Sequence, residues 1–316
     1  VKVFIPFGKK SEYEQKTIPF DEAFALKSSE LEAEDWISLF ELEMTSLHGV
    51  LIERIITKLK TTLKEFTILD IQETITNDSK SSPDTKQIVS ALFAAADNWG
   101  IFSKSEFGTE ISQLIAPGIS TVIDISSYSS IGAFNIRALV ISLVCRKLFE
   151  KRMSARKKEE LDALQHGQDY LSYKTDRKEP LIWIFIDEAH EFLPRIGKTP
   201  ATDALVQILR EGRQPGISIV LATQQPGQIH KDVMTQSDLV LAHRITAKPD
   251  IEALNDIMQT YLLKNIKQQI DDLPPLKGSA IILDDNSERI YPIRVRPRLT
   301  WHGGEAPTAV KADIQF

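Results

Sequence analysis

The sequence lacks several features that mark specialised classes of protein. Its 316 residues contain a single cysteine, Cys145, which excludes a disulfide framework and a cysteine-based zinc site. No apolar run approaches the roughly 20 residues that a membrane-spanning helix needs. Positive charge is in deficit, since 38 Lys and Arg face 44 Asp and Glu, and the net charge is −6. We therefore expect a cytoplasmic protein that does not contact a membrane and is not coated in positive charge, although a local basic channel stays compatible with this total.

The chain also lacks a signal peptide. It opens on Val1-Lys-Val-Phe-Ile5, without methionine and already alternating like a strand, so we expect a fragment whose upstream part is missing. Hydrophobic residues at 42% and charged residues at 26% are typical of a globular protein. The length suits two average domains, or one large α/β domain with an insertion.

Helical periodicity dominates the first third of the chain. Apolar residues recur every three or four positions from about Asp21 to Leu69, which predicts helix. The polar, breaker-rich stretch 77–83 predicts a surface loop, and 87–99 predicts a further helix. The chain up to Leu114 is therefore expected to be mostly helical.

After residue 115 the pattern changes to alternating strands and helices. Strands are predicted at 119–125, 181–186, 216–222 and 238–243, and helices at 135–164, 202–213 and 250–259. Such alternation implies parallel pairing and a doubly wound, mostly parallel α/β sheet. A closing hairpin is predicted from 279–283 and 289–295.

The sharpest motif follows the apolar strand 181–186, where Asp187 and Glu188 come directly after its last residue. Ligands of open α/β sheets bind beyond the carboxyl ends of the strands, so both acids would face a site. The pattern is that of a Walker B element. In it Asp187 would hold Mg²⁺, directly or through water, and Glu188 would polarise an attacking water. The alternative is a strand that simply ends in solvated acids.

Three further residues suit phosphate chemistry. Thr223 and Gln224 lie at the tip of the next predicted strand, where a polar side chain can contact a γ-phosphate. Arg213 ends the preceding helix, and its planar guanidinium suits the charge of a phosphoryl group in the transition state. The alternative for Arg213 is a charge that neutralises the helix dipole.

Several segments together resemble the HerA family of hexameric DNA translocases, within the HerA–FtsK group of RecA-like ATPases. The similar segments are 117–126, Ile184-Phe-Ile-Asp-Glu-Ala-His190, Arg210-Glu-Gly-Arg213, Ala222-Thr-Gln-Gln-Pro226, 293–298 and 302–304. They come in the family order and span most of the chain after residue 115.

The resemblance implies a RecA-like fold with an α-helical insertion and a C-terminal β-hairpin and tail. Residues 1–20 would be a strand and connection of the core, 21–114 the insertion, 115–290 the ATPase core, and 291–316 a tail that contacts the neighbouring subunit. It also implies an ATP- and Mg²⁺-dependent DNA translocase or helicase, a homo-hexamer on double-stranded DNA, acting in end resection and repair with a NurA-type nuclease.

The resemblance also assigns roles to individual residues. Asp187 and Glu188 would act as the Walker B pair and Gln224 as the sensor. Arg213 would be an arginine finger offered to a neighbouring subunit. Arg294 and Arg296 in the tail would contact phosphate or the neighbour's carboxylates, whereas the simpler interpretation of these arginines is an exposed edge strand whose charge discourages aggregation.

Two departures from the family pattern stand out. Gln225 occupies a position where relatives often have arginine, and no GxxxxGK[ST] phosphate-binding loop occurs in the sequence. Gly197-Lys-Thr199 follows the Walker B strand and lacks the first glycine, so we do not expect it to bind phosphate. The P-loop and a small barrel are expected upstream of Val1, and the fragment alone is expected to be inactive.

Other functions are also compatible with the sequence. Asp187-Glu-Ala-His190 also spells the motif of DEAH-box helicases, but only 93 residues follow Thr223, too few for their second domain. A conjugation or DNA-packaging ATPase and a non-catalytic scaffold subunit are the alternatives that remain. The helix predicted at 135–164 carries a basic cluster, which is either a solvated helix face or a nucleic-acid footprint. Its members are Arg146, Lys147, Lys151, Arg152, Arg156, Lys157 and Lys158.

Overall fold

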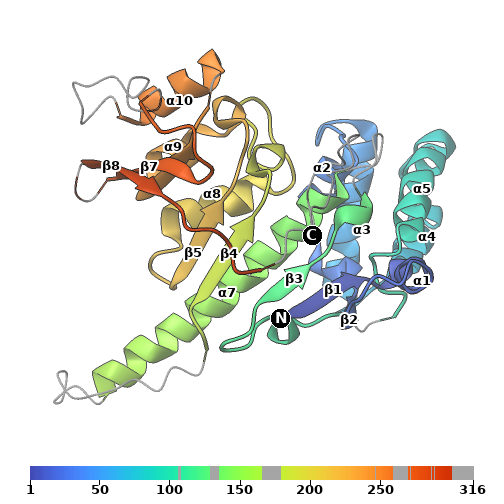
Figure 1. Ribbon diagram of the computed structural model, residues 1–316. Coiled ribbons are helices and arrows are strands. Elements are labelled where there is room, and N and C mark those ends of the chain that lie inside the picture. Colours follow the sequence, from blue (N-terminus) through green and yellow to red (C-terminus); the bar gives the residue numbers. More distant parts are fainter. Residues whose placement is uncertain are drawn as a thin grey trace. The chain divides into compact units, whose positions relative to one another are not determined.

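The chain forms two compact units, Val1–Gln236 and Ser237–Phe316. The computed structural model describes residues 1–105, 108–128, 135–165, 179–245, 247–258, 270, 272–285, 287 and 289–300. Figure 1 traces the helices and the strands. Helices accompany parallel strands in the first unit, and the predicted α/β class is confirmed.

A parallel sheet with the strand order β2-β1-β3 opens the first unit. β1 spans Lys2–Pro6 and lies between β2, Glu22–Phe24, and β3, Thr121–Ile123. The short helix α1, Lys10–Gln15, lies between β1 and β2 in the chain. The prediction of helix from about Asp21 is wrong where β2 lies. A strand of three residues is too short to show alternation, and its partner β1 is distant in sequence.

The helices predicted between the first strands and residue 114 are present. Their bounds are α2 Ala33–Leu39, α3 Leu47–Thr62, α4 Ile68–Thr76, α5 Pro83–Asn98 and α6 Ile111–Leu114. Ser46, Thr67 and Ser82 each begin a helix by accepting a hydrogen bond from the amide three residues later, which satisfies a donor that the first turn leaves free.

An aromatic cluster fills the core between these helices and the β2-β1-β3 sheet. Trp36 is fully buried, with ring centroids 4.9 Å from Phe93, 5.0 Å from Phe102 and 5.8 Å from Phe40. Phe4 of β1 belongs to the same core. The helices therefore share one hydrophobic core with the sheet.

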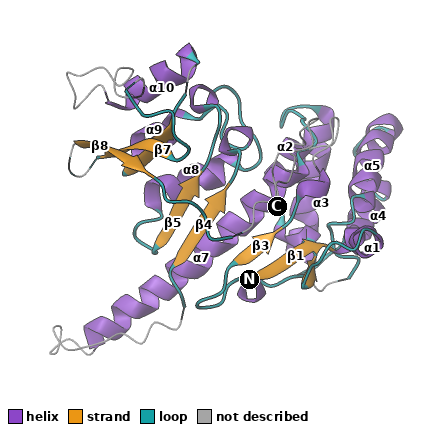
Figure 2. Cartoon of the chain, in the orientation of Figure 1, coloured by secondary structure: helices purple, strands orange, loops and turns teal. Residues whose placement is uncertain are grey.

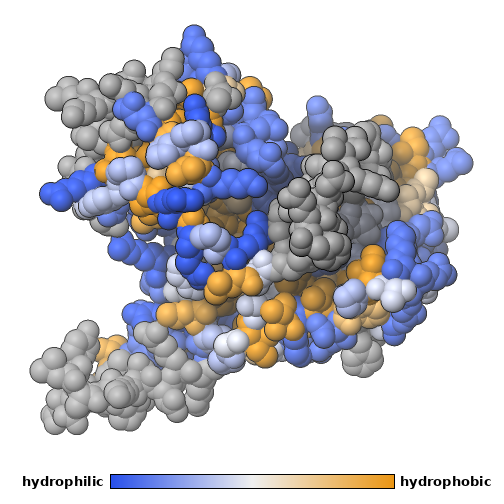
Figure 3. All heavy atoms as spheres, viewed as in Figure 1, coloured by the Kyte–Doolittle hydropathy of each residue, from blue (hydrophilic) through white to orange (hydrophobic). Residues whose placement is uncertain are grey.

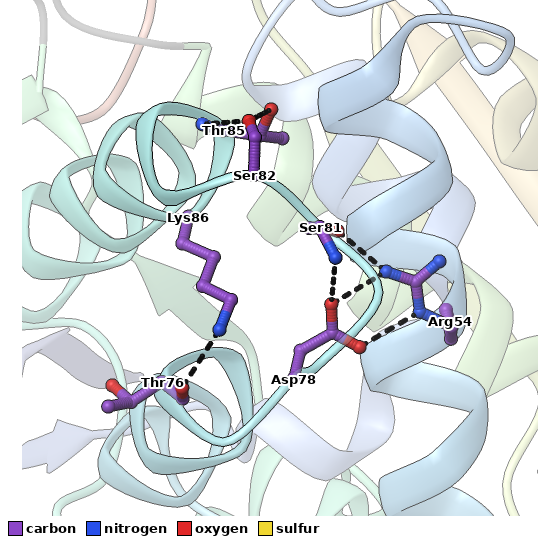
Figure 4. A network of polar contacts seen from close by, with 7 residues as sticks. All are labelled: Arg54, Thr76, Asp78, Ser81, Ser82, Thr85 and Lys86. Atoms are coloured by element: carbon purple, nitrogen blue, oxygen red, sulfur yellow. Dashed lines mark hydrogen bonds and ion pairs between the residues drawn. The ribbon is translucent and has the colours of Figure 1, made fainter.

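A polar clamp closes the loop between α4 and α5, as Figure 4 shows. Arg54 on α3 donates to both oxygens of Asp78, at 3.2 and 2.9 Å, and to the Ser81 hydroxyl at 2.7 Å. Burial alone would raise the pKa of Asp78, but its hydrogen bonds from Arg54 and Ser81 outweigh burial and hold that pKa below its ordinary value. The predicted loop at 77–83 is therefore a well-anchored turn.

The second sheet of this unit pairs β4, Ile182–Ile186, with β5, Ile217–Leu221, in parallel. One face packs against α7, Ile136–Gln165, and α8, Thr202–Glu211, as Figure 2 shows. Cys145 is buried in this core, and burial raises the pKa of its thiol to about 12.

The opposite face of β4 is apolar and open. Trp183 and Phe185 are 64% and 71% exposed, and their rings stack with centroids 6.3 Å apart. Val220 of β5 lies opposite Phe185. The strand that delivers Asp187 is thus buried on one face only.

The second unit contains an antiparallel sheet of β6, Leu239–His243, β7, Ser279–Asp284, and β8, Arg289–Arg294. The predicted hairpin of β7 and β8 is confirmed. The prediction of parallel pairing for 238–243 is wrong, because β6 runs antiparallel to β7. Strand–helix alternation along the chain does not reveal the direction in which a later strand returns.

The core of this unit joins the sheet to the helix α10, Lys248–Met258, through Ala242, Leu254 and Ile281. Figure 3 shows apolar residues gathered over β7 and β8 on the face in view. β8 is an edge strand, and Pro292 within it has no amide to donate.

Candidate nucleotide site

The two acids of the predicted Walker B motif, Asp187 and Glu188, begin the turn that follows β4. Asp187 is exposed and its Oδ1 accepts a hydrogen bond from the Glu188 amide at 3.0 Å. Glu188 has φ 47° and ψ 47°, a left-handed conformation that is rare for a residue with a side chain. Such backbone strain persists only where the surrounding structure holds it in place. Strained residues of this kind cluster at functional sites.

The tip of β5 lies beside this turn. The Ala222 amide donates to the Ile186 carbonyl, and the Ala189 amide donates to the Ala222 carbonyl, each at 2.9 Å. These bonds extend the pairing of β4 and β5 past the ends of both strands. As a result Gln224 Nε2 lies 2.6 Å from Glu188 Oε1 and donates to it. The structure thus brings together the predicted base and the predicted sensor, which are 36 residues apart in the sequence.

His190 completes this group, and the sequence pattern predicts no role for it. Its Nδ1 lies 3.0 Å from Thr223 Oγ1 and 3.5 Å from Glu188 Oε2. Glu188 Oε2 is buried and has no hydrogen-bond partner in the described part of the chain. The sequence signal was the histidine of the Asp-Glu-Ala-His segment, but the contact with Thr223 depends on the pairing of β4 with β5.

Two sets of contacts hold the turn after β4 in place: backbone hydrogen bonds to the turn after β5, and side-chain contacts from α7. The Arg195 amide donates to the Gln228 carbonyl and the His230 amide to the Leu193 carbonyl, both at 2.7 Å. Arg137, at the start of α7, forms an ion pair with Glu191 at 2.8 Å. Its guanidinium also lies 5.7 Å from the centre of the neighbouring Phe192 ring. The segment after Glu188 is therefore fixed to α7 and to the turn after β5.

Arg213 follows α8, two residues beyond its last helical position. Its side chain is exposed, and within the described residues it forms no hydrogen bond or ion pair. The nearby Arg210 is occupied, because it pairs with the buried Asp232 of α9, Lys231–Gln236, at 2.6 Å. Of these two arginines, Arg213 is the one available to a partner.

Arg152 anchors the loop that carries Arg213. This arginine of α7 is 1% exposed, and it donates to the Pro215 carbonyl at 2.8 Å and the Glu179 carbonyl at 3.1 Å. Gly216, the next residue, has φ 77°, which favours glycine. The turn between Arg213 and β5 is therefore held by the buried guanidinium of Arg152.

Gly197-Lys-Thr199 has a local structural role. The Thr199 hydroxyl donates to the Phe192 carbonyl at 2.8 Å, and the buried Thr202 hydroxyl donates to the same carbonyl at 3.0 Å. Lys198 pairs with Asp203 on the surface. These contacts tie the start of α8 to the turn after the site, and the absence of phosphate binding by this segment stays a prediction.

Much of the basic cluster on α7 is neutralised by ion pairs. Arg146 contacts Asp35 at 2.7 Å, Lys147 contacts Glu30, and Lys151 contacts Glu179 at 3.3 Å. Arg152 and Arg156 both contact Glu159. A helix face whose cations are already paired favours the structural interpretation over a nucleic-acid footprint.

Arg294 and Arg296 lie in the second unit. Arg294 ends β8 opposite Ser279, Arg296 follows the strand, and both are exposed. Their place at an edge strand fits the edge-protection interpretation, and a role toward nucleotide stays a prediction. Residues 302–304 and the rest of the tail from 301 onward lie outside the described residues.

The acids at the tip of β4 suit Mg²⁺ better than a cation that needs many protein ligands. Among the described residues, no group of three or more His, Cys, Asp or Glu side chains could enclose a metal ion. Mg²⁺ keeps several waters and is commonly held through one or two carboxylates together with substrate phosphates. The exposed Asp187 fits that kind of site.

Comparison with known proteins finds similarity over parts of the chain. The profile of the Zonular occludens toxin (Zot) family matches residues 133–248. Over 184 residues the chain is 28% identical to the DNA double-strand break repair helicase HerA of Pyrococcus furiosus, a match that covers 54% of this chain and 31% of that protein. Over 114 residues it is 35% identical to the probable DNA double-strand break repair helicase HerA of Methanocaldococcus jannaschii, covering 35% and 22%.

The chain is related to the HerA helicases. This confirms the predicted resemblance, although the match spans about a third or less of the length of these relatives. The structure of VirB4 of Thermoanaerobacter pseudethanolicus superposes with a TM-score of 0.52 at 12% identity, covering 94% of this chain and 82% of that one. The likeness shows that this chain shares the α/β fold of VirB4. None of the described helices combines the length and apolar character needed to cross a bilayer.

Proposed function

We propose that this chain is part of an ATP-driven DNA motor of the HerA type. The observation that carries the proposal is the contact of 2.6 Å between Glu188 and Gln224 at the tips of two adjacent parallel strands. A carboxylate that can accept a proton from water then lies beside an amide that can contact a phosphate. The relation to proteins named as double-strand break repair helicases supports DNA as the substrate.

Each residue at the strand tips has a distinct role in the proposed reaction. Glu188 orients the attacking water and accepts its proton, while Thr223 and Gln224 bind the γ-phosphate. Asp187 would hold Mg²⁺ through water, and the ion would neutralise charge on the phosphates. Arg213, which has no partner among the described residues, stabilises the transition state in the site of a neighbouring subunit.

The proposal extends to assembly and partners: the motor is a cytoplasmic homo-hexamer that threads double-stranded DNA and works with a NurA-type nuclease in end resection. An arginine finger given in trans requires a head-to-tail interface, and such an interface forms a ring when the rotation between successive subunits closes, as the proposed hexamer requires. The 316 residues contain no P-loop, so the proposal requires a phosphate cradle from outside them.

Exchange of Glu188 for Gln tests the proposed chemistry. In the gene product that contains these 316 residues, Glu188→Gln should lower the kcat of ATP hydrolysis by about 10²–10⁴, because the amide cannot accept the proton. Binding of a fluorescent ATP analogue should persist. Asp203→Asn, which changes a surface acid of α8, is the matched control and should keep wild-type turnover. Undiminished kcat in Glu188→Gln would refute the proposed base.

A further inference from the structure

We propose that His190 is a positioning residue that holds Glu188 through a proton on Nδ1 and thereby leaves the Thr223 hydroxyl proton free. The proton arrangement follows from the contacts alone. Only the use of the Thr223 proton, as a donor to a substrate phosphate, rests on the proposed function.

The contacts of the four side chains leave one acceptor without a donor. Glu188 Oε1 accepts from Gln224 Nε2 at 2.6 Å, and Thr223 Oγ1 accepts from the Gln225 amide at 3.0 Å. Glu188 Oε2 is buried, and no described donor makes a hydrogen bond to it. His190 Nδ1 lies 3.0 Å from Thr223 Oγ1 and 3.5 Å from Glu188 Oε2, within reach of both oxygens.

Two arrangements of the imidazole proton are possible when His190 is neutral. With the proton on Nε2, the Thr223 hydroxyl donates to Nδ1, and the lone pair of Nδ1 faces a buried carboxylate oxygen that has no donor. With the proton on Nδ1, the ring donates toward Thr223 Oγ1 and Glu188 Oε2 together. The second arrangement is favoured, because a buried carboxylate oxygen without a donor is costly and repelled by a lone pair.

The Nδ1 proton has two consequences for the site. It fixes Oε2 of Glu188 against His190, so that the carboxylate keeps one orientation while Gln224 holds or releases Oε1. It also makes Thr223 an acceptor toward both protein neighbours, and the hydroxyl hydrogen then points away from them. A polar hydrogen at the tip of β5 is suited to a phosphate oxygen.

Nuclear magnetic resonance of the 316-residue chain, labelled with ¹⁵N histidine, tests the assignment without nucleotide. Spectra recorded at about pH 8.5, above the ordinary histidine pKa of about 6.5, show which ring nitrogen carries the proton. We expect Nδ1–H for His190. His230 is an internal reference of opposite type, because its Nδ1 accepts from the Asp232 amide at 3.2 Å and its proton must therefore lie on Nε2. An Nε2–H signal for His190 would overturn the proposal.

Substitution of the two partners separates their contributions. In Thr223→Val the Nδ1 proton should remain on His190, because Glu188 Oε2 still needs a donor. In Glu188→Gln the preference for Nδ1–H should weaken, because the negative charge is gone. If Thr223→Val alone moved the proton to Nε2, the histidine would serve the threonine and not the carboxylate, and the proposal would be wrong.

Two substitutions of His190 test its effect on hydrolysis. Asn places an amide nitrogen near the position of Nδ1, whereas Gln places one near Nε2. In the gene product that contains these residues, His190→Asn should therefore retain at least tenfold more kcat than His190→Gln, with similar nucleotide affinity. Equal loss in both would refute the positioning role. Absence of hydrolysis in the unchanged protein would count against the proposed function and leave the spectroscopic result to decide the proton assignment.

Discussion

Arg152 shows how a single buried cation can set the position of a loop that carries a candidate catalytic group. Its guanidinium donates to the carbonyl of Glu179, shortly before β4, and to the carbonyl of Pro215, shortly before β5. It also pairs with the carboxylate of Glu159 on its own helix. A buried charge is stable only when its hydrogen bonds are satisfied, and removal of this cation takes a donor from both carbonyls and leaves Glu159 with Arg156 as its remaining cation. The loop from Arg213 to β5 is therefore fixed from α7.

Arg152→Met should lower the free energy of unfolding by about 3 kcal/mol, because the carbonyls of Pro215 and Glu179 lose their donor and Glu159 loses one of its two cations. Urea denaturation followed by circular dichroism measures this. The control is Arg156→Met on the same helix, whose exposed guanidinium pairs with Glu159 and Glu160. Its cost should stay below about 1 kcal/mol. Equal stability of the two variants would show that the contacts of Arg152 contribute little.

The residues of the site differ in how far the sequence predicts them. Asp187 and Glu188 follow a run of apolar residues, and Thr223 and Gln224 follow another, so local patterns place all four at strand tips. His190 and Arg152 act through partners 33 and 63 residues away, and no local pattern marks those pairs. Long-range polar contacts depend on strand pairing and helix packing, which periodicity does not specify.

The same limit applies to the elements. Long helices such as α5 and α7 and the apolar strand β4 are predicted to within a few residues, because each carries its own periodic or apolar signal. β2 contains only the three residues Glu22–Phe24, and it is a strand because it pairs with β1. The direction of β6 is set by β7, which begins 36 residues after β6 ends. Elements stabilised by distant partners are those that the sequence leaves undetermined.

The turn between α4 and α5 gives a pH-dependent prediction at this scale. The pKa of Asp78 is lowered in the folded protein, so its contribution to stability is complete above its unfolded pKa and is lost as pH falls through the folded value. Asp78→Asn should lower the free energy of unfolding by about 1–2 kcal/mol at pH 7. The difference from wild type should shrink from about pH 5 downward.

Urea titrations of both proteins between pH 7 and acidic pH measure this difference. Glu73→Gln, which changes an exposed acid on α4, is the matched control. It should show no comparable dependence. A constant difference between Asp78→Asn and wild type at every pH would contradict the role of the Arg54 clamp.

Assembly of several subunits is where the proposed role of Arg213 can be tested. Neither the Arg213→Ala subunit nor the Glu188→Gln subunit should hydrolyse ATP well alone, since an arginine finger contributes about 10³–10⁵ in rate. An equal mixture should create interfaces that have both groups, about a quarter of the total by random mixing around a ring. Activity of the mixture above that of either variant is the expected result. No recovery in rings shown to be mixed would return Arg213 to the role of a helix-terminal charge.

The tail requires a test that leaves the second unit folded. Deletion from residue 290 would remove nearly all of β8, which pairs with β7 along its whole length, and would expose the core around Ile281. The charges alone can instead be removed with Arg294→Gln and Arg296→Gln, since both side chains are exposed. If these arginines meet phosphate or a neighbour's carboxylates, the double variant should lose ATP hydrolysis and ring stability while its circular dichroism is unchanged. Sedimentation and steady-state hydrolysis measure the two effects.

Arg289→Gln, at the other end of β8, is the control and should behave as wild type. Full activity in the double variant together with increased aggregation would show instead that the arginines protect the edge of the sheet.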